Sequence, residues 1–146
     1  MQKELATFIL DQITPIVGYW ERDVNCFVGH LPIRNINGDE VNSIKRVCAI
    51  LFNTPAALVG DLPDRADQEV QIWNRHESYF KALDDAREFF TVLHGSSQWE
   101  LPILASGFVY TAMIIDAVAG PAVIENPDPK GRFVFSCNYL FRVCNP

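Results

Sequence analysis

The chain has 146 residues, a hydrophobic fraction of 49% and a net charge of −6 at pH 7. This length fits a single domain spanning residues 1–146, with enough apolar side chains for a core that needs no disulfide or metal. The acidic balance argues against nucleic acid and anionic membrane surfaces as direct ligands, because binding phosphate groups needs clustered lysine and arginine.

The cysteines and histidines show no spacing typical of a disulfide framework or a zinc site. Chains of this length and apolarity seldom depend on disulfides, so reduced, packed thiols are expected at Cys26, Cys48, Cys137 and Cys144. The three histidines are far in sequence from any cysteine pair; they are His30, His76 and His94.

Neither a secretion signal nor a membrane span is expected. Residues 1–16 are amphipathic rather than continuously apolar. The uncharged run 101–115 is shorter than a membrane span needs, contains Pro102 and Gly107, and ends before Asp116. Two strands separated by a turn explain this run better.

The first third of the chain predicts a helix, a strand and a long loop. Residues 1–16 have apolar side chains at helical spacing, and the buried stripe is expected to contain Leu5, Phe8, Ile9 and Ile13. Residues 19–28 form the first predicted strand, anchored by Trp20, Val24 and Phe27. Residues 29–45 lose periodicity and are rich in turn formers, so a loop is expected there, and loops of this length are commonly functional or mobile.

The middle of the chain predicts two further strands around an acidic loop. Residues 46–52 are apolar on both faces, which predicts a central strand covered on both sides. Residues 61–69 are predicted to form an acidic, turn-rich loop. A short alternating strand is expected over residues 69–75.

The clearest predicted element is a helix over residues 79–93, whose apolar side chains follow the i, i+3, i+4, i+7 rule. Ser78 is expected as its N-cap and Gly95 as the left-handed residue beyond its end. Strands are then predicted over residues 99–104, 109–118 and 132–144. The expected fold is α+β with the order α-β-β-β-α-β-β-β, in which two helices pack on one face of a mainly antiparallel sheet.

The C-terminal segment 120–144 combines a turn with an alternating strand. Two prolines, an aspartate and a glycine in residues 127–131 predict a tight turn. Lys130 and Arg132 are expected to be exposed at its tip. Apolar side chains then occupy every second position, and one face of the sheet beneath the second helix is expected to contain Phe133, Phe135, Tyr139 and Phe141.

No residues form a convincing catalytic, metal-binding or cofactor-binding set. Ser96 and Ser97 beside His94 lack the G-x-S-x-G elbow of an activated serine. No Gly-rich phosphate loop is present. Ordinary solvated loop residues are the favoured interpretation of two polar clusters, which are His30 with Asp39 and Glu40, and Asp61 with Asp64 and Asp67. Asp116, alone among apolar residues, is expected at a strand edge or an interface.

Several short motifs occur in a fixed order between residues 69 and 143. They are Val70-Gln71-Ile72-Trp73, Tyr79-x-x-Ala82-x-x-x-Ala86, Leu93-His94-Gly95, Gly120-Pro121, Asp128-x-x-Gly131-Arg132 and Phe135-Ser136-x-Asn138-Tyr139. In this order and spacing, they resemble the small tail-terminator proteins of long-tailed bacteriophages, also called minor capsid or tail completion proteins. The chain departs from that pattern in its proline-rich residues 125–128, and its loop 29–45 has no clear counterpart.

The resemblance implies a structural virion protein rather than an enzyme, with no cofactor. Such proteins, assembled in the host cytoplasm, form a homohexameric ring at the tail–head junction. The ring caps the tail tube, stops its polymerisation and contacts the head connector or neck protein, and DNA passes through its lumen without specific binding. The surface contacts are expected at His30, Arg34, Asn37, Glu40, Asp61, Asp64, Asp67, Asp128, Lys130 and Arg132.

Other functions remain open on the sequence alone. Within assembly, the chain fits a head–tail adaptor or completion protein, or a baseplate-side component. Outside it, a small non-enzymatic α+β ligand-binding or immunity-type module is an alternative, with aromatic residues lining a pocket. A hydrolase using His94 or His30 ranks last.

Overall fold

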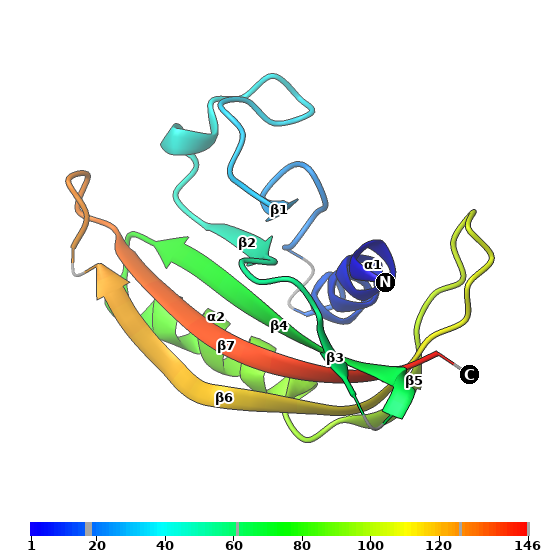
Figure 1. Cartoon of the computed structure of the whole chain (residues 1–146). Helices are drawn as coiled ribbons and strands as arrows, with labels where there is room; N and C mark the ends of the chain where they lie inside the picture. Colours follow the sequence, from blue (N-terminus) through cyan, green and yellow to red (C-terminus); the bar gives the residue numbers. More distant parts are fainter. Residues whose placement is uncertain (17–18, 61, 126, 146) are drawn as a thin grey trace.

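A curled, mainly antiparallel sheet of seven strands forms the frame of the computed structural model (Figure 1). The structure describes residues 1–16, 19–60, 62–125 and 127–145. The strands follow the order β1-β2-β4-β7-β6-β5, with β3 paired to β4. The predicted α+β class is confirmed. The elements are α1 (Gln2–Ile13), β1 (Cys26–Val28), a short 3-10 helix (Val41–Ser43), β2 (Val47–Leu51), β3 (Ala57–Val59), β4 (Leu62–His76), α2 (Tyr79–Leu93), β5 (Ser97–Glu100), β6 (Thr111–Glu125) and β7 (Phe133–Cys144).

Helix α2 begins and ends where its apolar periodicity predicts. Ser78 occupies the N-cap position, although its side chain makes no capping bond. Gly95 has a φ of 78°, the left-handed conformation that glycine adopts without steric cost. The buried stripe of α2 includes Ala82, Ala86, Phe89 and Leu93.

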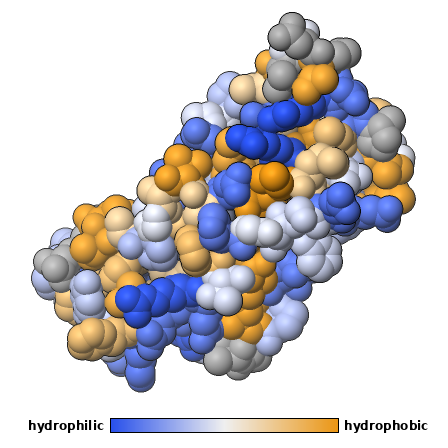
Figure 2. Space-filling view, turned by 90° about the horizontal axis from the view of Figure 1, so that it is seen from below, coloured by the Kyte–Doolittle hydropathy of each residue, from blue (hydrophilic) through white to orange (hydrophobic). Residues whose placement is uncertain are grey.

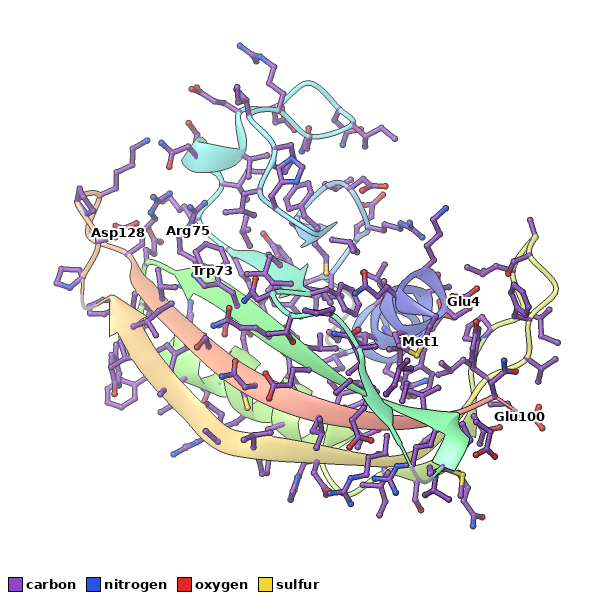
Figure 3. The ribbon with its side chains drawn as sticks, viewed as in Figure 1. Met1, Glu4, Trp73, Arg75, Glu100 and Asp128 are labelled. Carbon is purple, nitrogen blue, oxygen red and sulfur yellow. The ribbon has the colours of Figure 1, made fainter. Side chains whose placement is uncertain are left out.

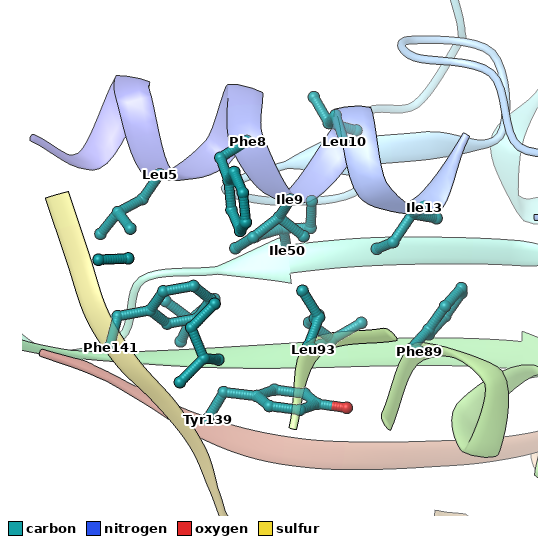
Figure 4. Close-up of a cluster of buried hydrophobic side chains, with 14 of the residues drawn as sticks. Leu5, Phe8, Ile9, Leu10, Ile13, Ile50, Phe89, Leu93, Tyr139 and Phe141 are labelled. Atoms are coloured by element: carbon teal, nitrogen blue, oxygen red, sulfur yellow. The ribbon is translucent and has the colours of Figure 1, made fainter. Parts of the chain in front are cut away.

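One large cluster of buried side chains joins both helices to the sheet (Figure 4). On the sheet side, Val70 faces Tyr139 and Ile72 faces Cys137 across β4 and β7. Burying a side chain of this size stabilises the fold by about 1.5–3 kcal/mol. The members drawn from the two helices are Leu5, Phe8, Ile9, Leu10, Ile13, Phe89 and Leu93.

The alternation of β7 is confirmed. Tyr139 and Phe141 belong to the large cluster. Phe135 packs against Ala82 and Ala86 of α2, with Phe133 partly buried beside them. The aromatic residues of this strand therefore face the helices, as the two-residue period predicts.

The opposite face of the sheet is covered in part by the loop 29–45. In β2 and β4, the residues next to those that face the helices point to this opposite face. Val47 and Trp73 are two of them, and they pack with Val41 of the loop. The guanidinium of Arg75, which is buried, donates from Nη2 to the carbonyls of Val41 and Ile44 at 3.0 and 2.8 Å. The loop is thus fixed to the sheet by a small apolar cluster and by side-chain hydrogen bonds.

The first strand is shorter than predicted, because a side chain holds the chain before it in a turn. Asn25 accepts a hydrogen bond from the backbone of Glu21 at 2.7 Å and donates to the carbonyl of Tyr19 at 2.9 Å. Extended structure therefore begins only at Cys26. Trp20 and Phe27 are nevertheless buried, as predicted.

The prediction of an acidic loop over residues 61–69 is wrong. Residues from Leu62 onward form the first half of β4. This half pairs with β3 on one side and with β7 on the other, down to the pair Arg65 and Cys144. The unexpected β3 adds a fourth strand before α2, so the predicted element order lacks one strand.

Strand β6 is longer than predicted and crosses the Gly120-Pro121 step. Its register against β7 shifts between Ala117 and Ala119 and again between Ala119 and Ala122. Such bulges accommodate a proline at an edge, where its missing N–H leaves no bond unmade. The uncharged run 101–115 divides into a projecting loop and the start of β6, and no described helix is long and apolar enough to cross a membrane.

Candidate functional site

The structure joins two of the three regions in which contact residues are predicted. Arg132 donates from Nη1 to the carbonyl of Asn42 at 2.6 Å and from Nη2 to the side-chain oxygen of Asn42 at 3.2 Å. The turn between β6 and β7 therefore contacts the loop 29–45 at the same end of the sheet. Figure 3 shows this arrangement, with Asp128 at the turn and Arg75 and Trp73 on the neighbouring strand.

The expectation that Arg132 is exposed is wrong. Only 8% of its surface is exposed, because its guanidinium is held between Asn42 and Asp128. Lys130, in contrast, is exposed. Of the two basic residues, Lys130 is thus available to a partner, whereas Arg132 has a structural contact within the chain.

Asp128 organises the turn. One carboxylate oxygen accepts hydrogen bonds from the backbone of Lys130 and Arg132 at 3.0 and 2.8 Å, and the other accepts from Nε of Arg132 at 2.9 Å. Burial alone would raise the pKa of Asp128, but these hydrogen bonds and the charge of Arg132 outweigh it and hold the pKa below its usual value. Asp128 is therefore an anion that shapes the turn.

The four predicted contact residues of the loop 29–45 are exposed, namely His30, Arg34, Asn37 and Glu40. Arg34 donates from Nη1 to the carbonyl of Gly38 at 2.8 Å, and its backbone bridges to Glu40. Asn35 is buried and accepts hydrogen bonds from the backbone of Asn37 and Asp39. Residues 34–40 thus form a hairpin within the loop, and this hairpin presents polar side chains to solvent.

The predicted acidic contact residues lie elsewhere. Asp64 and Asp67 lie on the first half of β4, where Arg65 donates to Asp67 at 3.3 Å and the carbonyl of Asp64 accepts from Asn145 at 2.8 Å. Figure 1 places this half of β4 near the C-terminus, at the end of the sheet away from the turn between β6 and β7. Asp61 lies outside the described residues. The predicted contacts are therefore divided between two ends of the molecule.

The outer edge of β6 is a surface that sequence reasoning missed. Strand β5 pairs with β6 only from Thr111 to Ile114, and the last bond on this side is made by the side chain of His94, which accepts from the backbone of Ala117 at 2.9 Å. Within the described part of the chain, no strand pairs with this edge beyond that point. Residues 118–125, called the open edge below, therefore present backbone groups to solvent.

The open edge is apolar as well as unpaired. Val118 is 61% exposed and Ile124 is 52% exposed, and Val123 is partly exposed between them. The face seen from below in Figure 1, where β6 forms the lower margin of the sheet, shows apolar areas among polar ones (Figure 2). Apolar side chains on an unpaired edge are typical of a surface that another chain covers.

Two loop tips add further exposed apolar side chains. The segment 101–110, closed by a bond from the backbone of Leu101 to the carbonyl of Tyr110 at 2.9 Å, projects from the sheet (Figure 1) and exposes Ile103 and Phe108. In the loop 29–45, Ile33 and Ile36 are exposed at 84% and 74%. The only sequence signal for these positions is an isoleucine or phenylalanine inside a turn-rich segment.

Two of the groups considered for catalysis, His94 and Ser96, are engaged in structural bonds. His94 accepts the bond from Ala117 described above, and the hydroxyl of Ser96 donates to the carbonyl of Val92 at 3.0 Å. Among the described residues, no group of three or more histidine, cysteine or acidic side chains is arranged to hold a metal ion. A groove of about 660 Å³ lies between α1 and the ends of β1 and β2, with Lys3 and Arg22 as its charged lining residues.

Comparison with known proteins adds no family to these observations. The chain matches no protein-family model. A search of curated proteins also finds no match. The surfaces described above, together with the motif order, are therefore the basis for assigning a function.

Proposed function

We propose that this chain is the subunit of a phage tail terminator. In this proposal six copies form a ring that caps the tail tube, stops its polymerisation and joins the tail to the head connector or neck protein. The order of motifs between residues 69 and 143 supports it. The observation that carries it is the open edge of β6, which is both unpaired and apolar.

A ring makes a specific demand on its subunit. Each copy must present two different, complementary surfaces, because a closed ring is built from head-to-tail contacts. The open edge supplies one such surface. The loop tips at Ile103 and Phe108 and at Ile33 and Ile36 supply exposed apolar side chains on other elements. An isolated subunit would leave all these apolar side chains in water. Large exposed apolar patches favour association of the subunit with another protein chain.

The charge of the chain also fits passage of DNA. Its net charge of −6 disfavours binding to phosphate groups. In the proposed ring the lumen lets DNA slide without sticking. A lumen lined mostly by lysine and arginine would contradict this part of the proposal.

Native mass spectrometry and electron microscopy of the purified protein test the proposal, with and without the tail tube protein of its phage. The expected result is a hexameric ring, present alone or formed when tube protein is added, and tubes that stop growing in its presence. A protein that remains monomeric with tube protein and leaves tube length unchanged would overturn it.

Deleting the gene from its phage separates the terminator from an adaptor at the same junction. Loss of a terminator leaves overlong tails without heads. Loss of a joining protein leaves tails of normal length that are not attached to heads. The second result would keep the chain at the junction but reject its role in stopping the tube.

A further inference from the structure

Two cysteines face each other in the core at the base of the loop 29–45. Cys26 of β1 and Cys48 of β2 are directly paired in the parallel register of these strands. Their sulfur atoms lie 2.8 Å apart, and both residues are fully buried. Both are free thiols.

This geometry is close to that of a disulfide. Adjacent strands lie about 4.7–4.9 Å apart, which falls within the Cα separation of about 4.4–6.8 Å found in disulfides. Because the side chains already point toward each other, closing the bond requires the sulfur atoms to approach by less than an ångström, to about 2.05 Å. No strand has to change its partner or register.

We propose that Cys26 and Cys48 are an intramolecular disulfide site, which small-molecule disulfides such as oxidised glutathione close and thiols reopen. One thiolate attacks oxidised glutathione and forms a mixed disulfide, releasing one molecule of glutathione. The second thiolate then attacks the protein sulfur, releases the second glutathione and leaves the bond between Cys26 and Cys48. Two protein thiols are oxidised, and one glutathione disulfide is reduced to two thiols.

The other two cysteines are not placed to compete. Cys137 lies on β7, which is separated from β2 by β4, and its thiol donates to the carbonyl of Ala119 at 2.9 Å. Cys144 lies at the end of β7, paired with Arg65 and Thr111. The pair Cys26 and Cys48 is therefore the one expected to close.

The cross-link would act on the loop that carries four of the predicted contact residues. Cys26 and Cys48 lie on the two sides of the loop 29–45, and β1 is held to the sheet by only three registered positions. A disulfide bond between the two cysteines would close the segment between them into a covalent loop. This covalent loop limits how far the segment can open. This inference does not depend on the proposed function, because it concerns the bond alone.

Burial sets when the bond can form. Because the Cys48 thiol is buried, its pKa is raised well above the usual value, so few thiolates are present and oxidised glutathione has little access. Oxidation of the folded protein is therefore slow, and the bond closes readily during folding, or when the short edge strand β1 opens.

The test is refolding of reduced, denatured protein in oxidised and reduced glutathione, compared with reduced glutathione alone. Thiol titration in denaturant is expected to find two thiols fewer after oxidative refolding, and peptide mapping without reductant is expected to find Cys26 joined to Cys48. The cross-linked protein is expected to have a Tm about 5–10 °C higher, and reductant is expected to remove this difference.

Limited proteolysis provides a second measurement that needs no variant. After a cut within the loop 29–45, the two fragments are expected to stay joined under denaturing conditions until reductant is added. The double variant Cys137→Ser, Cys144→Ser is expected to close the same bond, whereas Cys26→Ser is expected to lose it. Four titratable thiols after oxidative refolding, or a bond that involves Cys137 or Cys144, would overturn the proposal.

Discussion

Arg132 and Asn42, 90 positions apart in the chain, are joined by two hydrogen bonds of 2.6 and 3.2 Å from one guanidinium. The same guanidinium donates to Asp128 at 2.9 Å. Arginine suits this position, because its planar fork can satisfy a carbonyl, an amide oxygen and a carboxylate at once. The turn between β6 and β7 and the loop 29–45 therefore form one structural unit. A partner that binds one of these two segments would also contact the other.

Replacing Arg132 by alanine is expected to destabilise the protein by about 2–4 kcal/mol, because it removes a buried guanidinium and leaves the buried carboxylate of Asp128 without its charged partner. Urea unfolding followed by fluorescence measures this change. Lys130→Ala is the matched control, since Lys130 is a basic residue of the same turn but is exposed, and its effect is expected to stay within about 0.5 kcal/mol. Equal stabilities of the two variants would show that the Arg132 contacts contribute nothing.

The turn is also expected to respond to acid. The pKa of Asp128 is held below its usual value in the folded state, so its carboxylate binds a proton more readily in the unfolded state. Its contribution to stability is therefore complete above about pH 4 and is lost as the pH falls through the lower folded pKa. Nuclear magnetic resonance titration of the carboxyl carbon gives that pKa directly.

The variant Asp128→Asn isolates this effect from other acidic groups. Above pH 4 it is expected to be less stable than the native protein, and the difference is expected to shrink as the pH falls. A difference that stays constant from pH 5 to pH 2 would mean that the charge of Asp128 does not act in the folded state.

Local sequence patterns predict the helices and strands whose buried face they specify. They fail where a strand forms only by pairing with a segment that is distant in the sequence. Helix α2 is predicted to the residue because its apolar stripe is continuous and local. The first half of β4 looks like a loop, with its proline and acidic residues, yet it is extended because β7 continues to Cys144 and pairs with it. Strand formation there depends on a partner about 75 residues away, which no local window contains.

The candidate site shows the same division. The exposure of Lys130, Arg34 and Glu40 follows from charge and turn composition alone. The burial of Arg132 does not, because it depends on Asn42, which is remote in sequence. The open edge was also not predicted, because Gly120-Pro121 looks like the end of a strand. In the structure, β6 continues through this step with shifts in its register against β7.

A partly buried cation, Arg46, offers a test of packing near β2. Arg46 donates to both carboxylate oxygens of Asp85 on α2, at 2.9 and 2.6 Å. Its guanidinium carbon also lies 4.4 Å from the ring centre of Tyr19 and 4.9 Å from that of Trp20. The residue thus binds α2 to the segment before β1 through charge, hydrogen bonds and stacking.

Arg46→Lys is expected to destabilise the protein by about 1–3 kcal/mol despite keeping the charge, because lysine can neither form the paired bonds nor stack on the rings. Thermal and urea unfolding measure the loss. Arg87→Lys on the exposed side of α2 is the control and is expected to change stability by less than about 0.5 kcal/mol. If Arg46→Lys were as harmless as its control, the fork geometry would be irrelevant.

The open edge of β6 provides the most direct prediction for assembly. Val118 and Ile124 are exposed and make no core contact that a charge would disrupt, so Val118→Asp and Ile124→Asp are expected to leave the fold and the Tm of the isolated subunit nearly unchanged. Within a ring, a carboxylate at either position would be buried without a partner. Native mass spectrometry is expected to show either no hexamer or a hexamer that forms only at about 10–100-fold higher protein concentration.

The control is Lys81→Asp, which introduces the same carboxylate at an exposed position on α2 rather than on β6. It alters net charge by one unit more than the edge variants do, so an effect due to general repulsion would appear in it at least as strongly. A hexamer that survives both edge substitutions would remove the open edge from the interface and leave the tips of the loops 29–45 and 101–110 as the surfaces to test. Loss of the hexamer in the edge variants alone would identify the edge of β6 as a contact between copies.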